Sequence, residues 1–94
     1  MTHILVTHRV NDYATWKKVF DEFVETRKSF GEKTYQILHP TEDPNNLTLV
    51  FGWDTPQNAK RFFESTELQT TMQNAGVAEK PTITFMEESA HGTL

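Results

Sequence analysis

Residues 4–30 read ILVTHRVNDYATWKKVFDEFVETRKSF, and within them the spacing of apolar side chains changes from every second residue to about every 3.6 residues. Apolar and polar residues alternate over Thr2–Val10, which predicts a strand. Ile4, Val6 and His8 lie on the same side of that strand. His8 is therefore a titratable ring among aliphatic neighbours, which makes it either a core histidine or the polar group of a small pocket.

A helix is predicted to follow this strand directly. Asp12 offers a carboxylate that accepts hydrogen bonds from the free backbone N–H groups at a helix start. From Tyr13 to Phe30 the large apolar side chains recur at helical spacing, and most charged side chains take the opposite side. Gly31 tolerates the left-handed conformation that ends a helix. We expect one helix over residues 13–30.

Three more strands are predicted from alternating patterns. They cover Thr34–His39, Leu47–Asp54 and Thr82–Glu88. The segment Pro40–Asn46 is rich in turn-forming residues and joins the first two of these strands as a loop. The small, polar tail Ser89–Leu94 is expected to fray.

A second helical region is predicted between the last two strands. Thr55 followed by Pro56 is typical of a helix start, and apolar spacing continues to Ala75. The pattern that begins at Thr66 resembles a capping box, so this helix is expected to break near Ser65 and restart.

The element order β-α-β-β-α-β predicts an α+β fold of the ferredoxin-like type in a single domain over residues 1–94. Its expected solution is a four-stranded antiparallel sheet of order 4-1-3-2 with the helices on one face. Leu5, Val50 and Met86 give the other face an apolar character as well. An apolar sheet face without helices predicts a partner, and we expect a homodimer through the open sheet face, with a monomer as the alternative.

Composition excludes several classes of protein. The net charge is −4, and lysine and arginine are scattered, which argues against a nucleic-acid surface. No apolar run is long enough for a membrane span or a signal peptide. The absence of cysteine excludes disulfides and fits a reducing compartment, so we expect a cytoplasmic protein.

The predicted topology gathers several candidate site residues at one end of the domain. His8 and His39 fall near the C-terminal ends of the first and second strands, roughly 10 Å apart across the sheet. The first helix starts at that end and the second helical region finishes there. The residues expected together are His8, Tyr13, Trp16, His39, Leu68 and Met72.

These residues predict a pocket for a small aromatic or hydrophobic molecule. His8 is the candidate acid–base group, because its ordinary pKa lies near neutrality, and Tyr13 is placed to orient a phenol or carbonyl. Trp16, His39, Leu68 and Met72 are expected to line the pocket. The alternatives are a core His8 bonded to a backbone carbonyl or to Tyr13, a solvent-exposed His8, and a His39 that is only a surface residue. The four histidines lack metal-ligand spacing, so no metal and no cofactor is expected.

The chain resembles the dimeric α+β barrel superfamily, including antibiotic-biosynthesis-monooxygenase-like proteins and small cyclase-like proteins. The resemblance lies in the strand ILVTHRV, the run VNDYATWKKVFDE, the segment LVFGWDTPQNAKRFFES and the helix end MQNAGV. It covers residues 4–87, and it implies the fold and the dimer.

The resemblance leaves several activities open, because the superfamily hosts many reactions. Haem-degrading members use an asparagine on the first strand with tryptophan and histidine on the second helix; this chain has His8 and neither residue in 56–75, which argues against haem binding. Cyclases of this fold use strand histidines with a tyrosine, and His8 is the nearest match. We expect a cofactor-independent monooxygenase- or cyclase-like protein; the alternative is a non-enzymatic ligand-binding or stress-related dimer.

Overall fold

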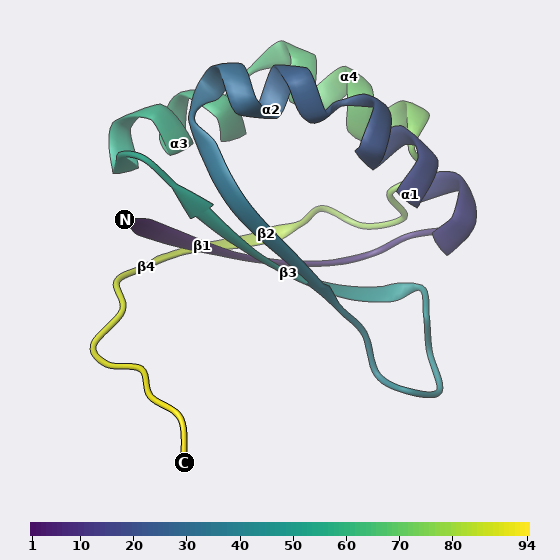
Figure 1. Ribbon diagram of the computed structural model, residues 1–94. Coiled ribbons are helices and arrows are strands. Elements are labelled where there is room, and N and C mark those ends of the chain that lie inside the picture. The colour runs from purple at the N-terminus through teal and green to yellow at the C-terminus, as the bar shows by residue number, and fades with distance from the viewer.

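Four antiparallel strands form one sheet, and four helices cover one of its two faces (Figure 1). The computed structural model describes all 94 residues. The strands are β1 (Thr2–Arg9), β2 (Glu32–Leu38), β3 (Asn46–Trp53) and β4 (Thr82–Met86). The helices are α1 (Tyr13–Glu22), α2 (Val24–Phe30), α3 (Pro56–Phe63) and α4 (Thr66–Asn74).

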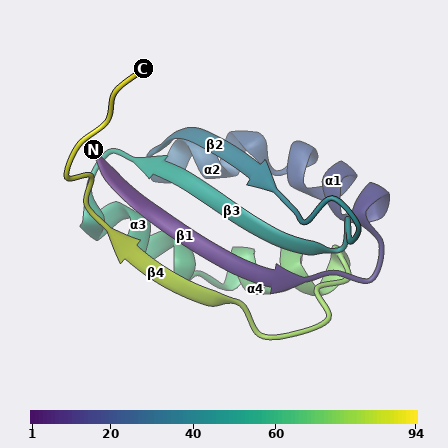
Figure 2. The same ribbon diagram turned by 90° about the horizontal axis from the view of Figure 1, so that it is seen from below.

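The order of the sheet is β2-β3-β1-β4, which is the predicted order 4-1-3-2 read from the other edge. The view from below shows the strands side by side in this order, with the helices behind them (Figure 2). Across the sheet, Leu49 on β3 lies opposite Val6 on β1, and Val6 lies opposite Ile83 on β4. These three side chains form one row, and they all line the cavity described below.

The single helix predicted over residues 13–30 is wrong, because the chain breaks at Phe23 between α1 and α2. Phe23 has φ −89° and ψ 5°, and its N–H divides between two preceding carbonyl oxygens. One of these, the Phe20 carbonyl, also accepts a hydrogen bond from Nη1 of the buried Arg27. In a continuous helix that carbonyl would accept from the N–H four residues on. The buried guanidinium therefore accompanies the break and occupies the carbonyl exposed by it.

The predicted break near Ser65 is confirmed, and α3 and α4 lie on either side of it. The cap of α4 is Ser65 itself rather than Thr66, since the Ser65 hydroxyl accepts from the Leu68 N–H at 3.2 Å. The Asp12 cap is also confirmed, because its carboxylate accepts from the Thr15 N–H at 2.9 Å.

The ends of the strands shift slightly from the predicted ones. β1 ends at Arg9, and Val10 forms an isolated bridge with Val77. β2 spans Glu32–Leu38 with a bulge near its start, so His39 lies just beyond it. From Glu87 onward the chain forms no helix or strand and lies exposed, as the yellow tail in Figure 1 shows.

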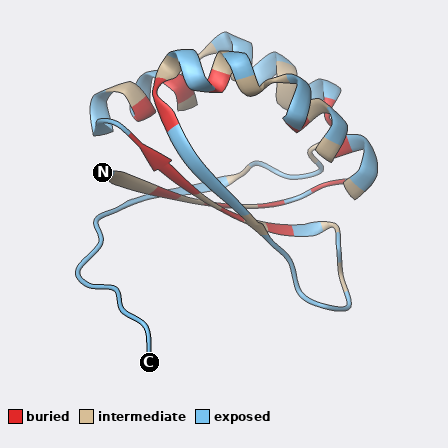
Figure 3. Ribbon diagram, viewed as in Figure 1, coloured by how far each residue is buried: buried red, intermediate tan, exposed pale blue.

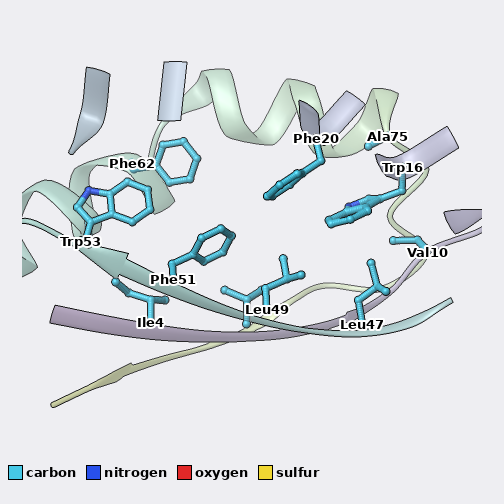
Figure 4. Packing of buried hydrophobic residues seen from close by; sticks show 12 residues of the cluster. Ile4, Val10, Trp16, Phe20, Leu47, Leu49, Phe51, Trp53, Phe62 and Ala75 are labelled. Atoms are coloured by element: carbon cyan, nitrogen blue, oxygen red, sulfur yellow. The ribbon is translucent and has the colours of Figure 1, made fainter. Parts of the chain in front are cut away.

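The core lies between the sheet and the helices. Figure 3 shows the buried positions concentrated on β1, on β3 and on the sides of the helices that face the sheet. In Figure 4 the rings of Phe62 and Trp53 gather at one end, and Trp16 lies at the other end with Val10 and Leu47. The Trp53 indole N–H donates to the Phe30 carbonyl at 2.8 Å, so this large ring is buried with its polar atom satisfied.

No helix covers the second face of the sheet (Figure 2). By the register, this face carries Leu5, Val50, Leu38 and Met86 together with several threonines. Leu38 and Met86 are nearly half exposed. None of the helices combines the length and the hydrophobicity needed to cross a membrane.

Candidate functional site

An apolar cavity of about 60 Å³ lies between the sheet and the helices. The row Leu49, Val6 and Ile83 forms its floor, because these side chains share the face of the sheet that points to the helices. Trp16 and Phe20 of α1 form part of its roof, with their rings stacked at a centroid distance of 4.9 Å. The walls are therefore almost entirely carbon.

Several of the more exposed residues that line the cavity belong to α4 and β4. Leu68 and Met72 of α4 line this side and are half-buried, and Ile83 on the edge strand β4 is 37% exposed. No side chain of α4 is buried, in contrast to the other three helices. Met72 is flexible and polarisable, so this wall adapts to a molecule that enters.

His8 borders the cavity from β1. It is 8% exposed, and neither of its ring nitrogens has a hydrogen-bond partner. Its nearest aromatic neighbour is Trp16, whose ring lies edge-on at a centroid distance of 5.8 Å. The bond to a backbone carbonyl or to Tyr13, which a purely structural histidine would use, is not formed. A buried polar atom without a partner lowers the stability of the folded protein by about 1–3 kcal/mol. A ligand that forms a hydrogen bond with His8 would therefore be favoured at this site.

Burial lowers the pKa of His8 from its ordinary value of 6.5 to about 4. At neutral pH the ring is therefore uncharged, with one nitrogen as a donor and the other as an acceptor. A neutral imidazole of this kind accepts a hydrogen bond from a ligand hydroxyl. It holds a transferred proton only if an anion forms beside it, because an opposite charge at short range raises the pKa again.

Four of the six predicted site residues surround the cavity, namely His8, Trp16, Leu68 and Met72. Tyr13 and His39 do not line it. The Tyr13 ring lies 6.0 Å from that of Trp16 and 6.1 Å from that of the exposed His39. These two residues therefore extend the aromatic cluster outward from Trp16, away from the cavity wall.

Arg27 also lines the cavity, and it is buried, with only 2% of its surface exposed. Its Nε donates to both carboxylate oxygens of Glu32, at 3.0 and 3.1 Å. Its guanidinium carbon lies 3.7 Å from the centre of the Phe20 ring. Burial raises the pKa of Glu32, and the neighbouring Arg27 opposes that rise. The Arg27–Glu32 pair packs against Phe20, which is part of the roof of the cavity. The polar groups of the pair bond to each other and to the Phe20 carbonyl.

Sequence reasoning missed Ile83, Ala75 and Thr71 as lining residues. Ile83 could have been predicted from the sequence. The strand order 4-1-3-2 places the last strand beside the first, and the alternating pattern of each strand shows which of its residues face the helices. Ala75 and Thr71 had none, because a small or polar residue at a helix end is ordinary on a surface. No group of three or more histidine, cysteine or acidic side chains gathers anywhere in the structure in a way that would hold a metal ion.

Comparison with known proteins identifies the fold. No protein-family model matches the chain, and no curated protein matches it. A solved structure of a proposed antibiotic biosynthesis monooxygenase from Bordetella bronchiseptica is 18% identical, with a TM-score of 0.78, covering 95% of this chain and 97% of that chain. A second such protein, from Nitrosomonas europaea, is 17% identical with a TM-score of 0.72, covering 96% and 100%.

A third solved structure is SnoaB, a cofactor-independent oxygenase from Streptomyces nogalater. It is 15% identical, with a TM-score of 0.69, covering 99% of this chain and 95% of that chain. At such identities the similarity shows the fold alone. The chain has the same fold as these solved structures, which is the fold that its sequence resemblance predicted.

Proposed function

We propose that this chain binds a small aromatic or hydrophobic molecule at the cavity beside His8 and acts on it without a cofactor, as a monooxygenase- or cyclase-like protein. The observation that carries the proposal is the buried imidazole of His8, which borders an apolar cavity and has no hydrogen-bond partner. The fold it shares with SnoaB, a cofactor-independent oxygenase, supports the same class of chemistry.

The size of the cavity supports a ligand that is held only partly inside it. Ordinary small-molecule pockets measure about 300–1,000 Å³, whereas this cavity holds about 60 Å³. An aromatic ring therefore enters on the side of α4 and displaces Leu68 and Met72, while a hydroxyl or carbonyl at its edge bonds to His8. Trp16 would offer its ring to the ligand, and Tyr13 and His39 would contact only a ligand that reaches past Trp16.

The proposed chemistry begins with a proton. A phenol or enol hydroxyl of the ligand donates to the acceptor nitrogen of His8, and the proton moves to that nitrogen as the ligand becomes an anion. The low dielectric of the cavity favours the resulting pair of opposite charges over either charge alone. The electron-rich anion is the species that cyclisation or oxygenation requires.

The properties of His8 also support a second function, in which the protein binds a ligand without turnover. Since burial lowers the pKa of His8 to about 4, the free protein has a weak base at neutral pH. That property favours a ligand-binding dimer without turnover. Dioxygen consumption with 1-naphthol as the probe separates oxygenation from binding alone, because oxygenation consumes dioxygen and binding does not.

The binding test uses His8→Leu, with His39→Leu as the matched control. His8→Leu removes the polar group and keeps a similar volume, so we expect 1-naphthol affinity to fall about tenfold, as an unpaired buried hydroxyl costs about 1–3 kcal/mol. His39→Leu is expected to leave the affinity unchanged, because His39 does not line the cavity. Equal affinity in both variants would remove His8 from the site.

We also propose that the chain forms a homodimer through the open sheet face. Leu5 and Val50 lie opposite each other at the centre of that face, and no helix covers them. Sedimentation at micromolar concentration is expected to give twice the chain mass of 10.9 kDa. Val50→Glu places a charge at the centre of the face and is expected to yield monomer, whereas Lys18→Glu, at an exposed position of α1, is not. A parent protein that sediments as a monomer contradicts the proposal.

A further inference from the structure

The helix α4 is the least firmly held element around the cavity. None of its side chains is buried, and every hydrogen bond that its residues make stays within residues 65–77. No ion pair joins α4 to another element. Its attachment to the rest of the protein therefore depends on three half-buried side chains that line the cavity, Leu68, Thr71 and Met72.

The sequence of α4 does not stabilise a helix by itself. TELQTTMQN has nine residues and contains three threonines, whose β-branched side chains lower helix propensity. Isolated helices shorter than about 12–15 residues are marginal in water. Once Leu68 and Met72 leave the cavity wall, little remains to hold the helix together. We therefore expect the opening of α4 and its unwinding to be a single event.

A surface hollow lies on each side of α4. Met72 and Pro81 line both the cavity and one hollow, whereas Phe23 and Thr71 line both the cavity and the other hollow. Successive residues of a helix point about 100° apart, so the two hollows flank the strip of α4 that faces the cavity. Neighbouring elements do not fill the space beside α4, and the helix moves without displacing them.

The two ends of this segment, in contrast, are fixed. Before α4, Phe62 of α3 is only 1% exposed. After α4, the Asn11 N–H donates to the Gly76 carbonyl at 2.9 Å, and the Ala78 N–H donates to the Arg9 carbonyl at 2.7 Å. A segment that is held at both ends and loosely packed between them has the arrangement of a lid.

We infer that residues 66–74 form a lid over the cavity, which opens by local unwinding between Ser65 and Gly76 while the rest of the fold stays intact. Opening removes Leu68 and Met72 from the wall, so a molecule larger than the cavity of about 60 Å³ gains access. The use of this lid by an aromatic ligand rests on the proposed function, whereas the unwinding of α4 does not.

Native-state hydrogen exchange of the full chain tests the unwinding. The N–H groups of residues 70–74 donate within α4, so they exchange only when the helix opens. We expect them to share one protection factor, on the order of tenfold below that of the α3 amides. The Ala78 amide, at the fixed end, should exchange more slowly than those of α4. Equal protection of α4 and α3, or exchange of Ala78 at the rate of α4, overturns the inference.

Two cap variants separate a local opening from unfolding of the whole protein. The Ser65 hydroxyl caps α4, and the Thr55 hydroxyl caps α3 in the same way. Ser65→Ala is expected to lower the protection of α4 about fivefold and to leave that of α3 unchanged. Thr55→Ala, the matched control, should leave the protection of α4 unchanged. An equal loss in α4 from both variants means that α4 opens only with the rest of the fold, which contradicts the lid.

Labelling of an introduced thiol tests whether the opening exposes the cavity. The chain has no cysteine, so Val6→Cys and Leu47→Cys each provide a single thiol. Val6 lines the cavity, whereas Leu47 is fully buried and does not line it. With a nitrobenzoate disulfide as the reagent, we expect Val6→Cys to react faster than Leu47→Cys. If Val6→Cys does not fold, Leu49→Cys takes its place, because Leu49 also lines the cavity.

A second substitution ties this labelling to α4. Thr70 is exposed on α4 and does not line the cavity, and Thr70→Ala raises helix propensity. We expect it to raise the protection of α4 and to slow the labelling of Val6→Cys, each by about threefold. Labelling that ignores Thr70→Ala refutes the lid as the entrance. Neither experiment uses 1-naphthol, so a failure of 1-naphthol to bind contradicts the proposed function and leaves the lid standing.

Discussion

His8→Leu is expected to remove a defined part of the pH dependence of stability. In the folded protein burial holds the pKa of His8 at about 4, against 6.5 in the unfolded chain. Below pH 6.5 the unfolded state therefore binds a proton that the folded state refuses, so the free energy of unfolding falls as the pH falls. The loss ends near pH 4, where the folded protein binds the proton as well.

The magnitude follows from the two pKa values. A difference of about 2.5 units corresponds to about 3 kcal/mol once both transitions are complete, and about 2 kcal/mol is lost by pH 5. At pH 7.5 the His8 term is near zero, and the variant is expected to be at least as stable as the parent, because it no longer buries two unpaired nitrogens. The two stability profiles should thus separate progressively on acidification.

The measurement is urea unfolding followed by tryptophan fluorescence at pH 7.5, 6, 5 and 4.5, at one protein concentration. Asp12 and Asp43, whose pKa values are lowered by hydrogen bonds, and Glu32, whose pKa is raised by burial, contribute equally to parent and variant. Their effects cancel in the difference. The control is His39→Leu, because the His39 ring is exposed. The stability of this variant should change with pH as that of the parent does.

The reasoning is refuted if parent and His8→Leu lose the same stability between pH 7.5 and pH 5. That result would mean that the imidazole takes up its proton at an ordinary pKa in the folded protein. The His8 ring nitrogens would then be hydrogen-bonded to water or to protein groups in solution, and they would not be free for a ligand.

Three further changes test the packing that surrounds the site. Glu32→Gln leaves Arg27 as an unpaired buried cation, and we expect urea unfolding to show a loss of about 3–5 kcal/mol, with Glu25→Gln, an exposed acid, as the neutral control. Gly31→Ala should cost more than about 1 kcal/mol in the same assay, because Gly31 has φ +113° and an added Cβ would clash with the carboxylate of Asp54. Asp12→Ala removes the cap of α1 and should lower thermal stability by about 1 kcal/mol, whereas Asp12→Asn should retain most of it.

The candidate site was only partly predictable from the sequence. The parity of β1 predicted that His8 faces the helices, and the helical spacing predicted the same of Trp16; both residues line the cavity. Tyr13 was predicted to lie beside His8, but its ring is directed to Trp16 and His39 instead. Spacing along a helix gives the side on which a residue lies, whereas the ring's partner depends on its rotamer and on the loop packed against it.

The break at Phe23 shows why one element was mispredicted. Every residue from Tyr13 to Phe30 is compatible with a helix, and the apolar spacing continues through the break. The interruption coincides with a guanidinium that reaches the Phe20 carbonyl and is itself held by Glu32, at the start of the next strand. These contacts join residues of three elements, α1, α2 and β2, only five and seven residues apart, but helical spacing alone does not show where the end of an arginine side chain lies.

The sequence by itself determined the order of the elements, the strand order, the inward faces of β1 and β3, and the presence of one imidazole among aliphatic side chains. These follow from periodicity and from short-range capping, which act over a few residues. Only the tertiary structure decided that His8 lacks a partner, that Arg27 pairs with Glu32, and that the space beside them measures about 60 Å³. A cavity or an unpaired polar atom remains where side chains from several elements do not fill the space completely. Its position depends on how all of these side chains pack together.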